Sequence, residues 1–380
     1  IMKEFLKKNK TAIIFIGIFL VVAGILAFAI YKTANKKVPE MIIENNILTN
    51  YQGASTEIAV DSSVEVIGVR AFEKKTKITK ISFGENSQLQ SIAYEAFNGC
   101  SGLVDIVLPN GLSTIGGAAF KDCAALENII IPEGVTDIEA YAFSGCRNLK
   151  SVSLPSTLEK LGESVFFGCS SLTTITCKSS NYKFEEGVLY NADKTELIKY
   201  LSTNTNKLYE VPEGVKKISS YAFQGATELQ YVTIGNNVEE IGYAILDGCD
   251  NVEELSVPFV GLTVSQNRKL AYFFGKVSQN LKTVSVTGAT TIGANTFKTW
   301  TKLERVNLSE GLAYIENEAF RGCTKLAYVN IPSTVKNVGV NAFAGCNKSI
   351  LIEVFNTEVY TQRWEPSWNA DNLYVEYVTK

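Results

Sequence analysis

Short apolar strand patterns recur along the chain at intervals of about 23 residues, and each is followed by a turn and a second apolar cluster. Three consecutive stretches, which begin at Leu103, Leu126 and Leu149, share the pattern L-x-x-I-x-L-P-x-x-L-x-x-I-G-x-x-A-F-x-x-C-x-x. Alternating residues such as Ile129 and Ile131 lie on one face of a strand. The proline that follows ends the strand, because it cannot donate a ladder hydrogen bond. The pattern predicts one structural unit repeated many times.

The aromatic residue of the motif marks the register of the repeat along most of the chain. It falls at Phe72, Phe97, Phe120, Phe143, Phe166, Phe223, Phe297, Phe320 and Phe343, with Ile245 in its place once. Most steps are 22 to 25 residues, but two steps of 57 and 52 residues each hold one repeat and an insertion. We therefore expect ten copies and two insertions.

The second apolar cluster of each unit is expected to close it over the core. Ile138, Ala142 and Phe143 are spaced i, i+4 and i+5, which predicts a short helical turn. One such unit cannot bury its apolar residues alone. Stacked units place equivalent residues on top of one another in continuous ladders. The sequence therefore predicts a repeat solenoid of mostly short β-strands with short helical turns.

An uncharged apolar segment, 11–31, lies close to the start of the sequence. It is flanked by Lys3, Lys7, Lys8, Lys10, Lys32, Lys36 and Lys37. As a helix it would be about 31 Å long, enough to cross the hydrocarbon core of a bilayer. We expect residues 1–37 to form a short cytoplasmic stub and a transmembrane signal-anchor helix. A cleaved signal peptide is the alternative, with small residues at Ala27 and Ala29. Both interpretations place the repeats outside the cytoplasm, either anchored in the membrane or secreted.

The 23-residue unit, over about residues 47–350, resembles the BspA-like, treponemal type of leucine-rich repeat. Val165 and Thr296 replace the alanine of the motif and are mild departures. The resemblance implies a right-handed β/α superhelix on a cell surface or in secreted form, with no catalytic residues to carry over. Known members act as adhesins or surface antigens. The resemblance therefore implies a non-catalytic module for adhesion or recognition of a protein partner.

We expect three parts: residues 1–37, a solenoid at 38–350 and a C-terminal cap at 351–380. The first insertion, about 178–206, contains two strand patterns, and the second, about 259–280, contains a short helical pattern. The insertions could bind a partner or could form flaps that bury their own apolar residues. Trp364 and Trp368 are expected to cover the last repeat, with a ligand-binding aromatic patch as the alternative.

Composition narrows the possible functions. The net charge is -3 and the chain has no histidine. A nucleic-acid binder needs a basic surface, and no catalytic triad or zinc site that uses histidine can form. We expect no metal, no cofactor and no small-molecule substrate. An enzyme based on carboxylates or tyrosine, with the second insertion as a lid, is a remaining alternative. A structural spacer in an envelope or matrix is another.

Seven of the eight cysteines recur at the same motif position and should form ladders: Cys100, Cys123, Cys146, Cys169, Cys249, Cys323 and Cys346. Cys177 falls at an inward strand position. We expect buried free thiols, because free cysteine behaves as a small core hydrophobe. Bridges between neighbouring repeats are the alternative, since strand spacing is compatible with disulfide geometry.

The exposed face of the strands is the candidate protein-binding surface. One column of outward positions carries Asn128, Ser151, Thr174, Tyr231, Glu254, Thr283, Arg305 and Tyr328. Such a face can dock a protein through many weak contacts, by analogy with other solenoids. A solvated sheet face made of residues that favour strands explains the same side chains.

Overall fold

The computed structural model describes residues 40–355 and 364–378. The expected membrane segment at 11–31 therefore lies outside the described residues, and no helix within them could span a membrane. The chain divides into two compact units, Ile1–Ile42 with Tyr51–Gly53 and Ile43–Asn50 with Ala54–Lys380. In the first unit, the backbone N–H of Gln52 donates to the carbonyl oxygen of Glu40 at 2.7 Å. The second unit contains the repeats.

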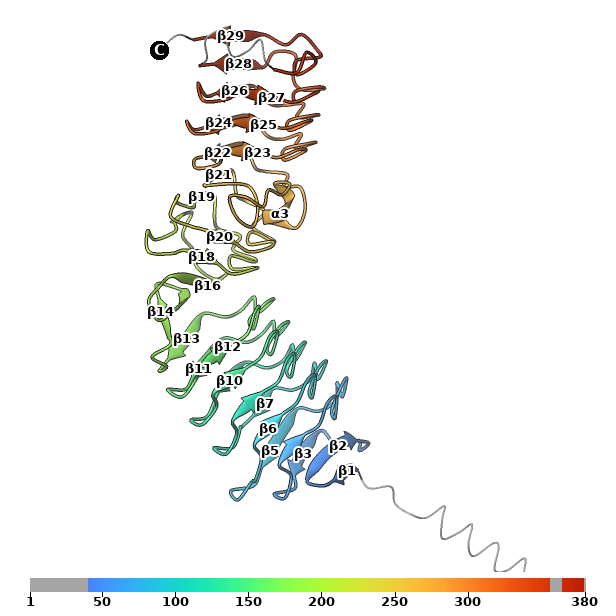
Figure 1. The fold of residues 1–380 in the computed structure, drawn as a ribbon. Helices are drawn as coiled ribbons and strands as arrows, with labels where there is room; N and C mark the ends of the chain where they lie inside the picture. The colour runs from blue at the N-terminus through green and yellow to red at the C-terminus, as the bar shows by residue number, and fades with distance from the viewer. Residues whose placement is uncertain (1–39, 356–363, 379–380) are drawn as a thin grey trace, which may run out of the picture. The chain divides into compact units, whose positions relative to one another are not determined.

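The second unit is a stack of coils, each of which contributes short strands to two rows (Figure 1). The row that carries the candidate face contains β3 (Glu57–Val60), β5 (Lys80–Phe83), β7 (Asp105–Ile106), β9 (Asn128–Ile130), β11 (Ser151–Leu154), β13 (Thr174–Cys177), β17 (Leu208–Glu210), β19 (Tyr231–Thr233), β21 (Glu254–Val257), β22 (Thr283–Val286), β24 (Arg305–Leu308), β26 (Tyr328–Ile331), β28 (Leu351–Val354) and β29 (Val375–Tyr377).

The other row begins after β1 (Met41–Glu44). It contains β2 (Ile47–Tyr51), β4 (Val66–Ile67), β6 (Ser91–Ile92), β8 (Thr114–Ile115), β10 (Asp137–Ile138), β12 (Lys160–Leu161), β14 (Tyr182–Glu185), β15 (Val188–Asn191), β16 (Glu196–Tyr200), β18 (Lys217–Ile218), β20 (Glu240–Ile241), β23 (Thr291–Ile292), β25 (Tyr314–Ile315) and β27 (Asn337–Val338). Strands of successive coils pair in parallel, and equivalent residues face one another, as Ser151 faces Asn128 and Thr174.

The aromatic ladder is confirmed. The ring centroids of Phe97 and Phe120 are 5.1 Å apart, and those of Phe120 and Phe143 are 5.4 Å apart. In the later coils Phe320 stacks on Phe343 at 4.8 Å. These side chains are fully buried. The repeat solenoid predicted from the sequence is therefore correct, because like residues stack on like.

The predicted helical turns are wrong. The residue two positions before the ladder residue has a left-handed backbone in ten coils: Arg70, Glu95, Ala118, Tyr141, Ser164, Tyr221, Ala244, Asn295, Glu318 and Asn341. This conformation cannot continue an α-helix. It directs the N–H of Tyr141 to the carbonyl oxygen of Glu163 in the next coil, at 3.0 Å. The turns are thus bonded between coils, and α3 (Ala271–Phe274) is the single α-helix of the described residues.

The first insertion forms an irregular coil of its own. Strands β15 and β16 pair antiparallel, as the two strand patterns predicted, and β16 then pairs in parallel with β18. The N–H of Tyr200 donates to the carbonyl oxygen of Ala222 at 2.8 Å, just as the N–H of Phe120 donates to Ala142. Tyr200 therefore takes the place of a ladder phenylalanine, with its ring 5.4 Å from that of Phe223.

The second insertion also completes a coil. Leu270, Phe273 and Phe274 are buried, and the N–H of Leu246 donates to the carbonyl oxygen of Phe273 at 2.7 Å. The ladder position of the preceding coil belongs to Leu246 and not to Ile245. The N–H of Cys249 bonds to the carbonyl of Leu246, as each regular ladder cysteine bonds to its phenylalanine.

The last coils are followed by a segment that packs against them. Strand β29 pairs in parallel with β28. The ring of Trp368 lies 5.9 Å from that of Phe343 and 5.1 Å from that of Trp364, both in edge-on geometry. Trp364 is buried. The two tryptophans thus contact the end of the aromatic ladder.

Candidate functional site

The predicted face falls on two separate sheets. Asn128, Ser151 and Thr174 lie in register on β9, β11 and β13, and the Ser151 hydroxyl donates to Oδ1 of Asn128 at 2.6 Å. The remaining five residues lie in register on five successive strands of the eight-stranded sheet, as Tyr231, Glu254, Thr283, Arg305 and Tyr328. The first insertion separates β13 from β17, so the structure does not bring all eight residues into one sheet.

The later part of this column combines charged and aromatic side chains. The Arg305 guanidinium lies 4.1 Å from the centre of the Tyr328 ring, and the Tyr328 hydroxyl donates to Oε2 of Glu353 at 2.5 Å. Burial, followed by the contact with Glu353, raises the pKa of Tyr328 to about 12. Tyr231 is exposed at the other end of the column. The column offers a cation, a carboxylate and aromatic surface on a rigid sheet.

Two strongly exposed aliphatic residues lie at the ends of earlier strands of this row, Ile130 as the last residue of β9 and Val107 directly after β7. Ile130 is 73% exposed and Val107 is 67% exposed. Both are outward positions next to the predicted column, and the alternation of each strand identifies them as outward. Exposure of these apolar side chains to water is unfavourable in the free protein. Burial of the same side chains against a partner would be favourable.

The ladder of backbone hydrogen bonds is interrupted where the first insertion meets the preceding coil. Strand β12 is the last strand of its sheet. The Tyr182 hydroxyl occupies the place of the next strand: it accepts from the N–H of Leu161 at 2.8 Å and donates to the carbonyl oxygen of Glu159 at 3.3 Å. The N–H of Gly168 donates to the side chain of Gln224 at 3.0 Å. Side chains thus replace the backbone ladder at this junction.

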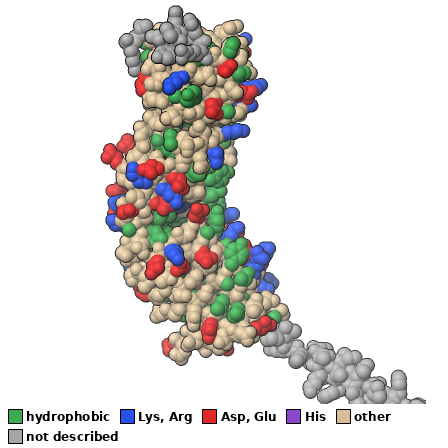
Figure 2. Space-filling view, viewed as in Figure 1, with side chains coloured by type: hydrophobic (Ala, Val, Ile, Leu, Met, Phe, Trp, Pro, Cys, Tyr) green, Lys and Arg blue, Asp and Glu red, His purple; other side chains and the backbone are tan. Residues whose placement is uncertain are grey.

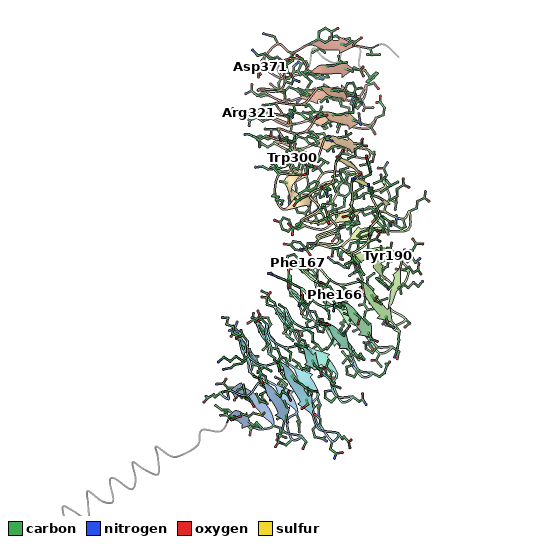
Figure 3. The ribbon with its side chains drawn as sticks, turned by 180° about the vertical axis from the view of Figure 1, so that it is seen from behind. Phe166, Phe167, Tyr190, Trp300, Arg321 and Asp371 are labelled. Carbon is green, nitrogen blue, oxygen red and sulfur yellow. The ribbon has the colours of Figure 1, made fainter. Side chains whose placement is uncertain are left out.

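The interruption leaves a groove, which we call the junction groove. One hollow of about 370 Å³ is lined by Glu159, Leu161, Gly162, Glu163, Ser164, Asn181, Tyr182, Asn191, Glu196, Ile198, Lys217 and Ser219. A second hollow of about 190 Å³ shares several of these residues and extends to Glu240, Gly242, Tyr243, Leu262 and Tyr272. Acidic and basic side chains are interspersed over the middle coils in Figure 2. Figure 3 labels Phe166, Phe167 and Tyr190 in the coils around this junction.

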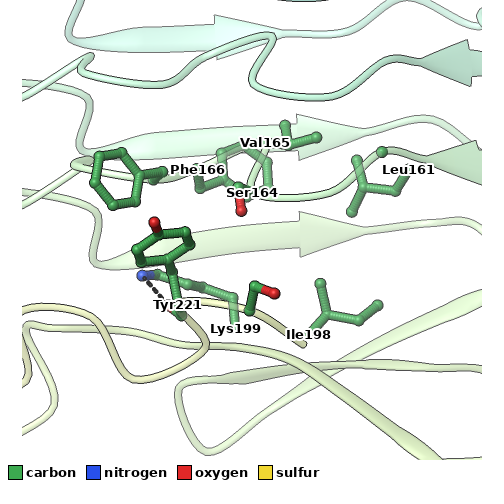
Figure 4. Close-up of a pocket in the computed structure, with 10 residues that line it drawn as sticks. Leu161, Ser164, Val165, Phe166, Ile198, Lys199 and Tyr221 are labelled. Carbon is green, nitrogen blue, oxygen red and sulfur yellow. Dashed lines mark hydrogen bonds between the residues drawn. The ribbon is translucent and has the colours of Figure 1, made fainter. Parts of the chain in front are cut away.

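Lys199 is buried at the base of the junction, with 7% of its surface exposed. Its ammonium donates to the carbonyl oxygens of Tyr221 at 3.4 Å and Gln224 at 3.5 Å. Because burial disfavours the charged form, the pKa of Lys199 is lowered to about 8. Figure 4 shows Lys199 and Ser164 directed into the same small hollow. The Ser164 hydroxyl oxygen is buried there and has no hydrogen-bond partner among the described residues.

Carboxylates dominate the charge of the junction groove. Glu159, Glu163, Glu196 and Glu240 line it together with one cation, Lys217. The Lys217 ammonium lies 3.1 Å from Oε1 of Glu196 and 4.0 Å from Oε1 of Glu240. Within residues 40–355 and 364–378, no cluster of three or more acidic or sulfur ligands could hold a metal ion. The groove thus offers four carboxylates and one ammonium group, which can form hydrogen bonds and ion pairs.

The first insertion was recognised from the sequence, but the junction groove was not. The interrupted step between Phe166 and Phe223 was the available signal, because a break in the repeat period is a place where the ladder can fail. Nothing in the sequence around Lys199 indicated that this lysine is buried. The alternation in the strand from Glu196 to Tyr200 does not distinguish a buried lysine from an exposed one.

Comparison with known proteins agrees with this architecture. A sequence model of the BspA type leucine-rich repeat region, in six copies, matches residues 41–146, 65–196, 198–271 and 270–361. No curated protein matches the chain.

Solved structures of bacterial repeat proteins share the fold. The pneumococcal vaccine antigen PcpA is 20% identical, with a TM-score of 0.59 over 90% of this chain and 85% of that chain. A leucine-rich repeat protein from Bacteroides ovatus is 24% identical, with a TM-score of 0.57 over 90% of this chain and 91% of that one. A leucine-rich cell surface protein from Faecalibacterium prausnitzii is 22% identical, with a TM-score of 0.52 over 85% and 94%. The aromatic ladder, the 23-residue register and the matched family together show that this chain belongs to the BspA type of leucine-rich repeat proteins.

Proposed function

We propose that the protein is a non-catalytic recognition module that binds another protein on the exposed face of its strands. The observation that carries this proposal is the column from Tyr231 to Tyr328, which holds five outward side chains in register on five successive strands. Flat, rigid arrays of this kind suit a partner that is held by many separate contacts. The polar residues between the aromatic ends would fix the orientation of the partner.

We further propose that the repeats are displayed outside the cytoplasm, anchored or secreted, and that the role is adhesion or recognition at a surface. The motif is typical of surface proteins, and one structural relative is described as a cell surface protein. Protease treatment of intact cells tests the location. Loss of the repeats without lysis is the expected result, whereas protection until lysis would contradict display.

A photocrosslinking amino acid at position 231 in the full chain tests the binding face. On intact cells that meet the protein naturally, we expect one discrete adduct, which disappears when Arg305→Ala is added. The control for the crosslinker position is the same amino acid at position 314, because Tyr314 is exposed on the other row of strands. The control for Arg305→Ala is Arg147→Ala, which removes an exposed arginine away from the column.

Equal crosslinking from positions 231 and 314 would contradict the assigned face. Adducts only between copies of the chain, with ordered self-assembly, would instead support a structural spacer. These outcomes separate the two functions because recognition needs a foreign partner and a spacer does not.

A further inference from the structure

Four aromatic side chains lie outside the strands of the proposed binding face, and we call them the aromatic edge. Phe167, Tyr221 and Tyr243 lie in the turns that follow β12, β18 and β20, and Tyr272 lies in α3. We propose that the aromatic edge is a second binding site, which takes a proline-rich segment of another protein with a basic residue beside the prolines. The inference rests on the protein being a protein-binding module, but it does not depend on the strand face being the main site.

The rings of the aromatic edge form one continuous series. The ring centroids are 4.7 Å apart for Phe167 and Tyr221, 5.8 Å for Tyr221 and Tyr243, and 5.5 Å for Tyr243 and Tyr272, and each pair meets edge to face. Tyr243 is 45% exposed, and the other three side chains are half-buried. In Figure 2 hydrophobic side chains gather along the side of the molecule on which α3 lies in Figure 1. A contiguous exposed surface of this kind is typical of an interaction site, whereas single exposed tyrosines are not.

Hydrogen bonds between successive coils hold the three tyrosines in place. The N–H of Tyr221 donates to the carbonyl oxygen of Tyr243 at 3.0 Å, and the N–H of Ala244 donates to that of Tyr272 at 2.8 Å. The Tyr272 hydroxyl donates to the carbonyl oxygen of Ile241 at 3.2 Å. The rings are therefore ordered before a partner binds, which lowers the entropic cost of binding.

The spacing of the rings fits a polyproline II helix. Tyr221 and Tyr272 lie two coils apart, which is about 9.6 Å at the spacing of paired strands. One turn of a polyproline II helix rises about 9.3 Å, and every third residue returns to the same side. Prolines of successive turns would therefore pack against Tyr221 and Tyr272, with the exposed ring of Tyr243 between them. Proline-rich segments bind aromatic-lined grooves in this way because their conformation is already formed.

The hollow beside the aromatic edge favours a basic residue next to the prolines. Tyr243 and Tyr272 line the hollow of about 190 Å³ together with the carboxylates of Glu163 and Glu240. A lysine or arginine of the ligand would complement these charges. The backbone of a polyproline II segment forms no internal hydrogen bonds, so its carbonyl groups can accept from the Tyr243 hydroxyl. That hydroxyl bonds to no other residue of the described part of the chain.

Fluorescence anisotropy with the full chain and a labelled decaproline peptide that carries one terminal arginine tests this site. We expect saturable binding. Tyr243→Ala should weaken binding by about tenfold, because it removes the central ring. Tyr243→Phe keeps the ring and removes only the hydroxyl, so it should weaken binding by about threefold or less. Glutamate in place of the arginine of the peptide should weaken binding by several fold, because it reverses the charge that meets Glu163 and Glu240.

The matched variant is Tyr314→Ala, which removes a tyrosine of similar exposure, 47%, away from the aromatic edge and should leave affinity unchanged. The matched peptide replaces the prolines by glycine and serine, which form a flexible chain, and should not bind. No saturable binding of the decaproline peptide, equal affinity for the glycine–serine peptide, or equal weakening by Tyr243→Ala and Tyr314→Ala would overturn the site. Binding of an uncharged oligosaccharide that Tyr243→Ala abolishes, without binding of the peptide, would assign the aromatic edge to glycans and overturn the proline-rich ligand. Arg305→Ala should not change peptide binding, so failure of the strand-face proposal remains distinguishable from failure of this one.

Discussion

The thiol of Cys146 donates a hydrogen bond to the backbone carbonyl oxygen of Phe120, one coil earlier, at 3.1 Å. The same bond recurs in seven coils at 2.9–3.3 Å, from Cys100, Cys123, Cys146, Cys169, Cys249, Cys323 and Cys346. All eight cysteines are free thiols in the structure. The cysteine ladder therefore couples each turn to the aromatic ladder of the previous coil and satisfies a buried carbonyl group.

The reactivity of these thiols follows from their burial. Burial raises the pKa of Cys123 and Cys146 well above the usual range, and it raises the pKa of Cys177 as well, although Cys177 is only half-buried. Because the thiolate is the reactive form, alkylation at pH 8 should be slow for Cys123 and Cys146. We expect Cys177 to react before them. Mass spectrometry after iodoacetamide treatment measures the order, and guanidinium should make all three react at similar rates. Equal rates in the native protein would contradict this account.

The aromatic ladder should dominate stability locally. Phe120 is fully buried between Phe97 and Phe143. Phe120→Ala leaves a cavity in the ladder and should lower the free energy of unfolding by about 3–5 kcal/mol. Guanidinium denaturation followed by circular dichroism measures the change. Val107→Ala is the control, because Val107 is 67% exposed and its loss should cost less than about 0.5 kcal/mol. Similar losses in the two variants would contradict the ladder.

The aromatic ladder could be predicted from the sequence because each ladder residue stacks on its equivalent one repeat away. The repeat period alone therefore identifies the residues in contact. It could not predict the turns. The spacing of Ile138, Ala142 and Phe143 suits a helix equally well, and only the left-handed backbone of Tyr141, with φ 60°, shows that the turn bonds to the next coil. Tyrosine rarely adopts this conformation, so its identity gave no signal.

The junction shows the same limit for the candidate site. Leu197 faces Ile218, and the N–H of Tyr200 bonds to Ala222, so the coil of the insertion is two residues shorter than its neighbour. Lys199 therefore stands where Ala222 stands in the next coil, at the buried position before the ladder residue. The periodicity of regular repeats contains no information about a coil of different length. The strand face, by contrast, follows from alternation within each strand, and its residues were found in register within each sheet.

The backbones of neighbouring coils approach so closely at Gly242 that no side chain fits there. A Cβ atom at Gly242 would lie 2.3 Å from the backbone nitrogen of Ser220. Gly242→Ala must therefore push the coils apart, and we expect a loss of at least about 2 kcal/mol in the free energy of unfolding. Gly84→Ala is the matched control, since nothing lies within 4 Å of its Cβ position. It should change stability by less than about 1 kcal/mol. Equal effects in denaturation experiments would show that the coils can separate freely.

The buried ammonium of Lys199 should make stability depend on pH in a defined direction. Its pKa is about 8 in the folded protein against 10.5 ordinarily, because burial disfavours the charge. The unfolded chain therefore binds more protons between these values, so stability should rise with pH through this window. The cost of burial below pH 8 is on the order of 3 kcal/mol.

Lys199→Met keeps the volume and removes the charge, so it should stabilise the protein at pH 7 by up to about 3 kcal/mol. The advantage should shrink to about 1 kcal/mol or less at pH 10, where the unfolded lysine is itself partly neutral. Guanidinium denaturation of both proteins at the two pH values isolates this group, because all other titrations cancel in the difference. Lys150→Met, which removes an exposed lysine, should show no such dependence on pH. A difference between Lys199→Met and the parent that stays constant with pH would mean that Lys199 keeps its ordinary pKa and that the junction is wetter than its packing indicates.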